Sequence, residues 1–177
     1  MTVILVYVDD IIIIGTDVST IESIKQFLHN QFKLKDLSPL QYFLGLEVAR
    51  SKKGIFLSQQ KYTLDILEET ELLGTKPVSF PMEQNLKLTL DDEPLFSDPS
   101  SYYRLVGRLI YLTITRPEIT FSVNILSQFM RTLHQSHMDA AFRALQYLKL
   151  NPGKGILMPS PNNLQLLTFS DFKLGMS

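Results

Sequence analysis

The sequence predicts an α+β fold, in which a small antiparallel sheet with two helices is followed by a helical region. Three observations support this prediction: β-branched runs flank an acidic pair near the N-terminus, apolar residues recur at helical spacing after residue 99, and four of the nine prolines fall between residues 77 and 99. Of the 177 residues, 45% are hydrophobic and 20% are charged. This composition is typical of a globular protein with a core of its own.

The first predicted elements are two strands and a helix. Residues 2–8 and 11–15 are β-branched and apolar, and they meet at Asp9-Asp10, which predicts a hairpin although the turn lacks the usual glycine. Ser19-Thr20-Ile21-Glu22 has the spacing of a capping box, which predicts the start of a helix. This helix runs to about residue 32, with an apolar stripe of Ile21, Ile24, Leu28 and Phe32.

Two more strands and a second helix are predicted next. Residues 42–50 and 55–58 have the composition of strands and are joined through Lys53-Gly54. Ser58 can cap a helix that Gly74 stops. The apolar side of that helix consists of Tyr62, Ile66, Leu67 and Leu73.

A proline-rich stretch then separates this region from a helical one. Residues 77–98 combine prolines with an acidic run, and we predict an extended linker there. Asp98 can cap the next helix, with Pro99 at its first position. Pro117 and Ser136 open two further helices, the last with Met138, Ala141, Leu145 and Leu148 facing inward. The final predicted elements are two short strands, 155–158 and 164–170.

Residues 99–158 carry seven basic and two acidic side chains. Such a region is either a phosphate-facing surface or an ordinary solvated helix face. Arg143 lies opposite the apolar stripe of its helix, so we expect it to be exposed. Together with Lys149 and Lys154 it forms the leading candidate contact to a nucleic-acid backbone. We expect the others on the first of these helices and beside it, Arg104, Arg108 and Arg116, to form internal ion pairs.

Several classes of protein are excluded by what the sequence lacks. There is no cysteine, which excludes a disulfide framework, a thiolate metal site and a cysteine nucleophile. The most apolar stretch, 2–15, is interrupted by Asp9 and Asp10 and is shorter than the roughly 20 apolar residues needed to cross a bilayer. We therefore expect an intracellular protein with no signal peptide, no transmembrane segment and no membrane partner.

The carboxylate pair Asp9-Asp10 is the strongest chemical feature of the sequence. Two adjacent carboxylates on a tight turn repel each other, and a divalent cation offsets that repulsion. Hard oxygen ligands suit Mg²⁺, and paired ions can catalyse phosphoryl transfer. The alternative is an exposed acidic turn without a ligand.

The segment Tyr7-Val8-Asp9-Asp10, followed by the apolar run 11–15, resembles the catalytic hairpin of reverse transcriptases of Ty1/copia-type retrotransposons. Residues 41–48 resemble the primer grip of the same family. Further segments are similar in the same order along the chain: 32–37, 57–62, 76–81, 103–112 and 115–119. The resemblance covers essentially the whole chain.

This resemblance implies an RNA-directed DNA polymerase of a Pol polyprotein, with an RNA or DNA template-primer as its nucleic-acid partner. Asp9 and Asp10 are then the catalytic metal ligands, for Mg²⁺ or alternatively Mn²⁺. Tyr7 lies beside the template-primer. The primer end is held by the segment 42–48, within which Tyr42, Phe43, Leu44 and Gly45 are the assigned contacts. For Tyr7, Tyr42 and Phe43 the alternative is that they are ordinary core aromatics.

The resemblance also implies a division of the chain. Residues 1–76 form a partial palm with the catalytic hairpin, the primer grip and the start of the thumb, and 77–98 form the linker. Residues 99–158 form the helical thumb or connection region. Residues 159–177 form a truncated start of a ribonuclease H domain, in which Asp171 is a vestigial metal ligand.

In the family, the fingers and the first palm strand, with its own metal-binding aspartate, precede the hairpin. Asp17 is too close to the hairpin along the chain to replace that aspartate. We therefore expect a polymerase fragment that is inactive alone. The alternative is a decayed or non-catalytic remnant that binds nucleic acid.

Overall fold

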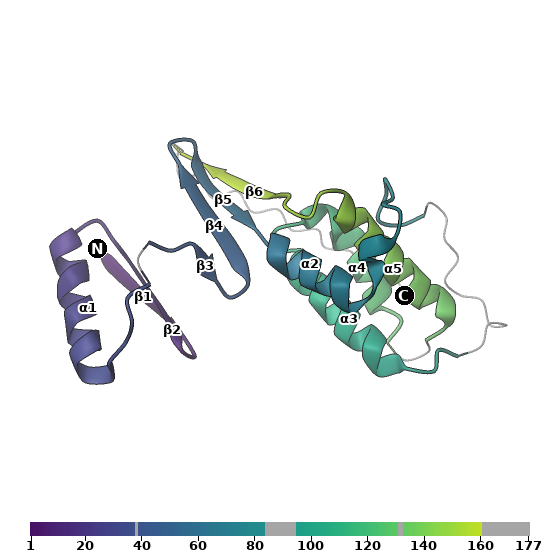
Figure 1. Cartoon of the computed structure of the whole chain (residues 1–177), viewed down its shortest axis with the longest axis horizontal. Helices are drawn as coiled ribbons and strands as arrows, with labels where there is room; N and C mark the ends of the chain where they lie inside the picture. The colour runs from purple at the N-terminus through teal and green to yellow at the C-terminus, as the bar shows by residue number, and fades with distance from the viewer. Residues whose placement is uncertain (38, 84–94, 131–132, 161–177) are drawn as a thin grey trace, which may run out of the picture.

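A computed structural model of the chain describes residues 1–37, 39–83, 95–130 and 133–160. The α+β prediction is confirmed: two small antiparallel sheets and a group of helices make up this part of the chain (Figure 1). The first sheet and its helix lie at one end of the molecule, the helices lie at the other, and the second sheet lies between them (Figure 1). None of the described helices is long and apolar enough to cross a membrane.

The N-terminal hairpin consists of β1 (Thr2–Tyr7) and β2 (Asp10–Gly15). Its register pairs Tyr7 with Asp10, so the turn consists of Val8 and Asp9. The prediction of an Asp9-Asp10 turn was therefore wrong by one position, because Asp10 is already paired as the first residue of β2.

Helix α1 (Val18–Phe32) follows the hairpin and is capped by Asp17. The Asp17 carboxylate accepts hydrogen bonds from the Ser19 backbone amide at 3.0 Å and from the Thr20 hydroxyl at 2.5 Å. The predicted capping box at Ser19 was wrong, because the charged Asp17 acceptor two residues earlier satisfies the first free amide of the helix. Glu22, the other half of that box, pairs with Lys25 instead.

The second sheet has the strand order β3-β4-β5-β6 and is antiparallel throughout. Its strands are β3 (Tyr42–Phe43), β4 (Leu46–Ser51), β5 (Gly54–Ser58) and β6 (Gly155–Pro159). The single strand predicted over 42–50 was wrong, because Leu44 and Gly45 adopt positive φ angles of 49° and 78° and fold it into a hairpin. Strand β6 follows α5 in the chain and pairs with β5, so this sheet joins residues that are far apart in the sequence.

One apolar core unites the helices. The helices are α2 (Gln60–Glu69), the 3₁₀ turns η1 (Leu72–Gly74) and η2 (Pro117–Ile119), α3 (Pro99–Leu112), α4 (Thr120–Ser127) and α5 (Gln135–Leu150). Asp98 caps α3 with Pro99 in its first turn, as predicted. Helix α2 begins after Gln59 rather than Ser58, and α5 begins at Gln135 rather than Ser136. Core residues come from both sides of the proline-rich stretch and include Ile66, Leu67, Tyr102, Leu109, Leu112, Leu126, Leu145 and Leu148.

Some predictions lie outside the described residues. These are the greater part of the acidic linker, at 84–94, the strand at 164–170 and Asp171. The described ends of the linker, 77–83 and 95–98, contain no helix or strand.

Candidate active site

The turn of the β1–β2 hairpin has an unusual backbone. Val8 has a φ angle of 48°, in the left-handed region that a β-branched residue rarely adopts. Backbone strain of this kind is found at functional sites, where the surrounding structure maintains it. Here it places Asp9 and Asp10 side by side at the end of two apolar strands, with both residues exposed.

The two carboxylates fit a hard divalent cation. Mg²⁺ is commonly bound by one or two protein carboxylates, with substrate phosphates and water completing its shell. In the part of the chain that the structure describes, no group of three or more His, Asp or Glu residues is arranged to hold a metal. Asp17 has a different role, since its hydrogen bonds to Thr20 and Ser19 lower its pKa to about 2 as it caps α1.

The β3–β4 hairpin presents the residues assigned to the primer end. Tyr42 pairs with Glu47 and Phe43 with Leu46, which leaves Leu44-Gly45 as a two-residue turn. Two successive positive φ angles are typical of a tight hairpin turn, and glycine meets that requirement at low cost. Tyr42 is 55% exposed and Phe43 is half-buried, so neither is a core aromatic in this structure. Tyr7, also 55% exposed, is not one either.

Tyr111 on α3 connects this turn to the helical core. Its hydroxyl donates a hydrogen bond to the Leu44 carbonyl, and its ring meets Tyr62 of α2 edge to face, with centroids 5.4 Å apart. Burial raises the pKa of Tyr111, and nearby Tyr42 and Tyr7 raise it further. The primer-grip turn is therefore attached to α3 through this tyrosine. This role was not predicted from the sequence, because Tyr111 lies one turn after Gly107 and Arg108 rather than on an apolar stripe of the helix.

Glu47 provides a second link between the primer-grip hairpin and the helices. Its carboxylate accepts hydrogen bonds from the Ser58 hydroxyl at 3.1 Å and from the Lys61 backbone amide at 2.7 Å. Lys61 lies in the first turn of α2, where a carboxylate satisfies a free amide and favours the helix dipole. Strand β4 is thereby fixed to the start of α2.

The three basic residues predicted to face nucleic acid are all engaged with the protein. Arg143 pairs with Glu83 at 2.9 Å and its side chain is only 31% exposed, so the expectation that it projects freely was wrong. The Lys149 ammonium donates to the carbonyls of Leu73 and Thr75. Lys154 pairs with Glu118 at 3.1 Å. Their contact with nucleic acid stays a prediction, and these partners favour a structural role.

Two of the predicted internal ion pairs are confirmed. Arg108 binds Glu69 through two nitrogens, at 2.5 and 3.0 Å. The buried Arg116 donates to Glu118 at 2.9 Å and to the Asn151 carbonyl at 3.0 Å. These contacts join α2 to α3 and η2 to the end of α5.

Known proteins are similar to this chain in sequence. Residues 1–84 match the family model described as reverse transcriptase (RNA-dependent DNA polymerase). Over 167 residues, which are 94% of the chain, it is 42% identical to the retrovirus-related Pol polyproteins from transposons RE2 and RE1 of Arabidopsis thaliana. It is 35% identical to an uncharacterized mitochondrial protein of the same plant, of which it covers 69%. The chain belongs to the copia-type reverse transcriptase family.

The resemblance drawn from the sequence motifs is thereby confirmed. The chain spans 12% and 11% of the length of the RE2 and RE1 polyproteins. It corresponds to part of their reverse transcriptase domain. Proteins of the reverse transcriptase family use divalent metal ions and act on nucleic acid. No solved structure matches the chain significantly.

Proposed function

We propose that this chain carries the catalytic hairpin and the primer grip of a copia-type reverse transcriptase and acts in templated DNA synthesis as part of a longer Pol polyprotein. The observation that carries this proposal is the pair of exposed carboxylates on a hairpin with a strained turn, in a chain whose primer-grip turn is held to α3 by Tyr111. Its nucleic-acid partner is a template-primer of RNA or DNA.

In this proposal each segment has one task. Asp9 and Asp10 hold Mg²⁺, or alternatively Mn²⁺. When bound, the ion activates the attacking hydroxyl and stabilises charge on the phosphate. Tyr7 lies beside the template-primer, and the Tyr42–Gly45 turn holds the primer end against the hairpin. Because two carboxylates alone leave the family's third metal ligand unsupplied, the 177-residue polypeptide should not extend a primer by itself.

The proposed division of the chain follows these tasks. Residues 1–76 form the partial palm, the primer grip and the start of the thumb, and 77–98 the linker. Residues 99–158 form the thumb or connection region, and 159–177 the start of a ribonuclease H domain, with Asp171 as a vestigial metal ligand.

A second candidate function is that of a decayed or non-catalytic remnant that binds nucleic acid. The observation in its favour is the 35% identity to the uncharacterized mitochondrial protein, most of whose length this chain covers. A remnant no longer selected for catalysis need not keep a metal-binding hairpin.

Manganese titration tests the metal site directly. Mn²⁺ added to the isotopically labelled chain should broaden the amide signals of Val8 to Ile11 first. Replacing Asp9 and Asp10 with asparagine should abolish that broadening. The matched control replaces Asp65 and Asp139, which lie on α2 and α5, and should leave it unchanged. Uniform broadening that does not depend on Asp9 and Asp10 would contradict the assigned site.

A further inference from the structure

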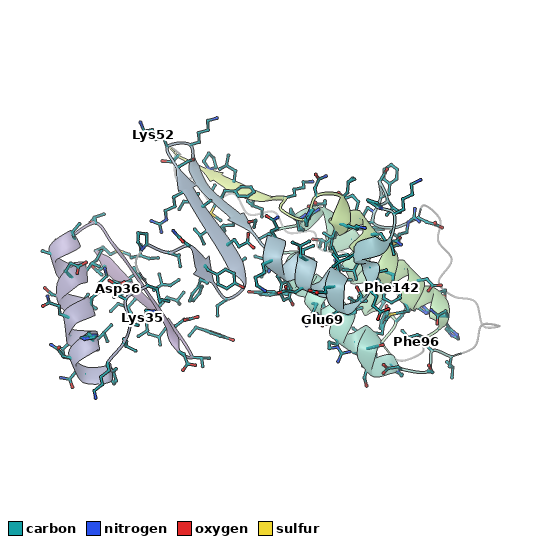
Figure 2. All side chains as sticks on the ribbon, in the orientation of Figure 1. Lys35, Asp36, Lys52, Glu69, Phe96 and Phe142 are labelled. Carbon is teal, nitrogen blue, oxygen red and sulfur yellow. The ribbon has the colours of Figure 1, made fainter. Side chains whose placement is uncertain are left out.

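Several basic side chains in the described part of the chain have their charge paired within the protein. Those in ion pairs are Lys25, Lys61, Arg108, Arg116, Arg143 and Lys154. Arg50, Lys52 and Lys53 are exposed and form no ion pair with a described residue, as is also true of Lys33, Lys35, Lys76 and Arg104. They are singled out because three such residues lie within four positions of the sequence. Lys52 and Lys53 form the turn between β4 and β5 and Arg50 lies near the end of β4, where Figure 2 shows Lys52 at the far end of the sheet. We call these three residues the basic tip.

The nearest acidic residue before the basic tip is Glu47, whose carboxylate is bound to the Ser58 hydroxyl and the Lys61 amide. Residues 48–64, which include β5, contain no Asp or Glu, and neither do residues 155–160, which include β6 beside it. Three cations thus lie at one end of a sheet, and none of them is in an ion pair with any residue that the structure describes. Such an uncompensated cluster attracts polyanions.

The backbone of the basic tip is fixed before any ligand arrives. The Lys53 amide donates to the Ser51 hydroxyl at 3.1 Å, and the Lys53 carbonyl accepts from the Ser160 amide at 2.9 Å. Gly54 has a φ angle of 143°, and a Cβ there would overlap the Met158 carbonyl oxygen, so β6 can pack directly against the turn. The cations are therefore presented on a hydrogen-bonded frame, which lowers the entropy cost of binding.

Strand β4 connects the basic tip to the primer-grip turn. The Leu44-Gly45 turn precedes this six-residue strand, and the basic tip lies at its other end, with Arg50 in its last residues and Lys52 and Lys53 directly after it. At the usual rise per residue this separation is about 20 Å. Stacked base pairs rise 3.4 Å each, so the same length of duplex contains about six base pairs.

We propose that the basic tip binds the phosphate backbone of the template-primer duplex about six base pairs behind the primer end. This inference rests on the proposed function, because that function places the primer end at the Leu44-Gly45 turn. The basic tip supplies affinity and orientation without reading sequence, as contacts to phosphate do.

The test measures how the affinity of the full chain for template-primer duplexes depends on salt and on duplex length. The test variant replaces Arg50, Lys52 and Lys53 with alanine. A matched control removes three exposed basic charges elsewhere, Lys35, Lys76 and Arg104. A third variant keeps the charge with Arg50→Lys, Lys52→Arg and Lys53→Arg. Circular dichroism confirms that each variant is folded.

We expect the alanine variant to lose about two to three units of the log-log salt slope, since each neutralised phosphate contributes about 0.9. Its affinity at low salt should fall at least tenfold, while the control and the charge-keeping variant match the unchanged chain. The slope of the unchanged chain should also rise as the duplex is lengthened past about six base pairs, and that of the alanine variant should not.

Three results would overturn the inference. A salt slope unchanged by the alanine substitutions would do so while leaving the proposed function intact. If the basic tip binds vesicles with anionic headgroups and does not bind duplex, its ligand is a lipid surface. An unchanged chain that binds no duplex would contradict the proposed function, and the inference would fall with it.

Discussion

At the scale of single residues, Val8 is where residue type and backbone conformation disagree most. Its φ angle of 48° costs a β-branched residue about 1 to 2 kcal/mol, whereas asparagine tolerates this region. We expect Val8→Asn to stabilise the β1–β2 hairpin by about 1 kcal/mol, seen as roughly fivefold slower amide exchange in β1 and β2. Val6→Asn, within a regular strand, is the control and should not slow exchange. Faster exchange in Val8→Asn would show that the turn is not strained.

The Asp17 cap gives helix α1 a defined pH dependence. Its hydrogen bonds lower the pKa from 3.8 to about 2, so the carboxylate stabilises the folded state above about pH 4. That contribution is lost as the pH falls through about 2. Amide protection of α1 should therefore decrease over this range, and the decrease should be smaller in Asp17→Asn. Identical pH profiles for the two proteins would contradict the assigned cap.

At the scale of elements, Tyr111 should control how firmly the primer-grip turn is held. Tyr111→Phe keeps the ring against Tyr62 but removes the hydrogen bond to the Leu44 carbonyl, which is worth about 1 kcal/mol. We expect faster amide exchange around Gly45 and weaker binding of recessed primer ends, with unchanged binding of blunt duplex. Tyr103→Phe removes a similar bond, to the Met130 carbonyl, and serves as the control. Equal effects of the two substitutions would mean that Tyr111 has no special role.

The basic residues of α5 and the following turn should act mainly on stability. Arg143 and Lys149 tie α5 to the 73–83 segment, and Lys154 pairs with Glu118. Replacing all three with alanine should lower Tm by several degrees and leave the salt slope of duplex binding unchanged. A lower slope with an unchanged Tm would instead support the nucleic-acid contact predicted from the sequence.

Local sequence patterns predicted most helices and strands of this fold. Contacts between residues far apart in the sequence were not predicted. The β-branched runs around the carboxylate pair and the Asp98-Pro99 signal predicted a hairpin and a helix start because their causes lie within a few residues. The pairing of β6 with β5 and the bond from Tyr111 to Leu44 join residues far apart in sequence. No local pattern predicts such contacts, so the attachment of the primer-grip turn to α3 became visible only in the structure.

At the scale of the whole molecule, burial is unevenly distributed. Helix α1 has no buried residue, and Ile4, Leu5 and Val6 of β1 are 47%, 49% and 62% exposed. The buried apolar residues lie in the region from α2 to α5. We expect amide exchange in the hairpin and α1 to proceed by local opening at much lower free energy than in the helical core. Uniform protection across the chain would contradict this distribution of stability.

The central claim, that Asp9 and Asp10 are the catalytic pair of a copia-type reverse transcriptase, is tested most directly by transplanting this chain. It would replace the matching part of an active copia-type enzyme, and primer extension would be measured with Mg²⁺. We expect the chimaera to extend the primer, with a loss of at least a hundredfold on replacing either aspartate with asparagine, while Asp65→Asn has little effect. A chimaera that remains equally active without both carboxylates would contradict the claim, and one inactive from the start would favour the remnant.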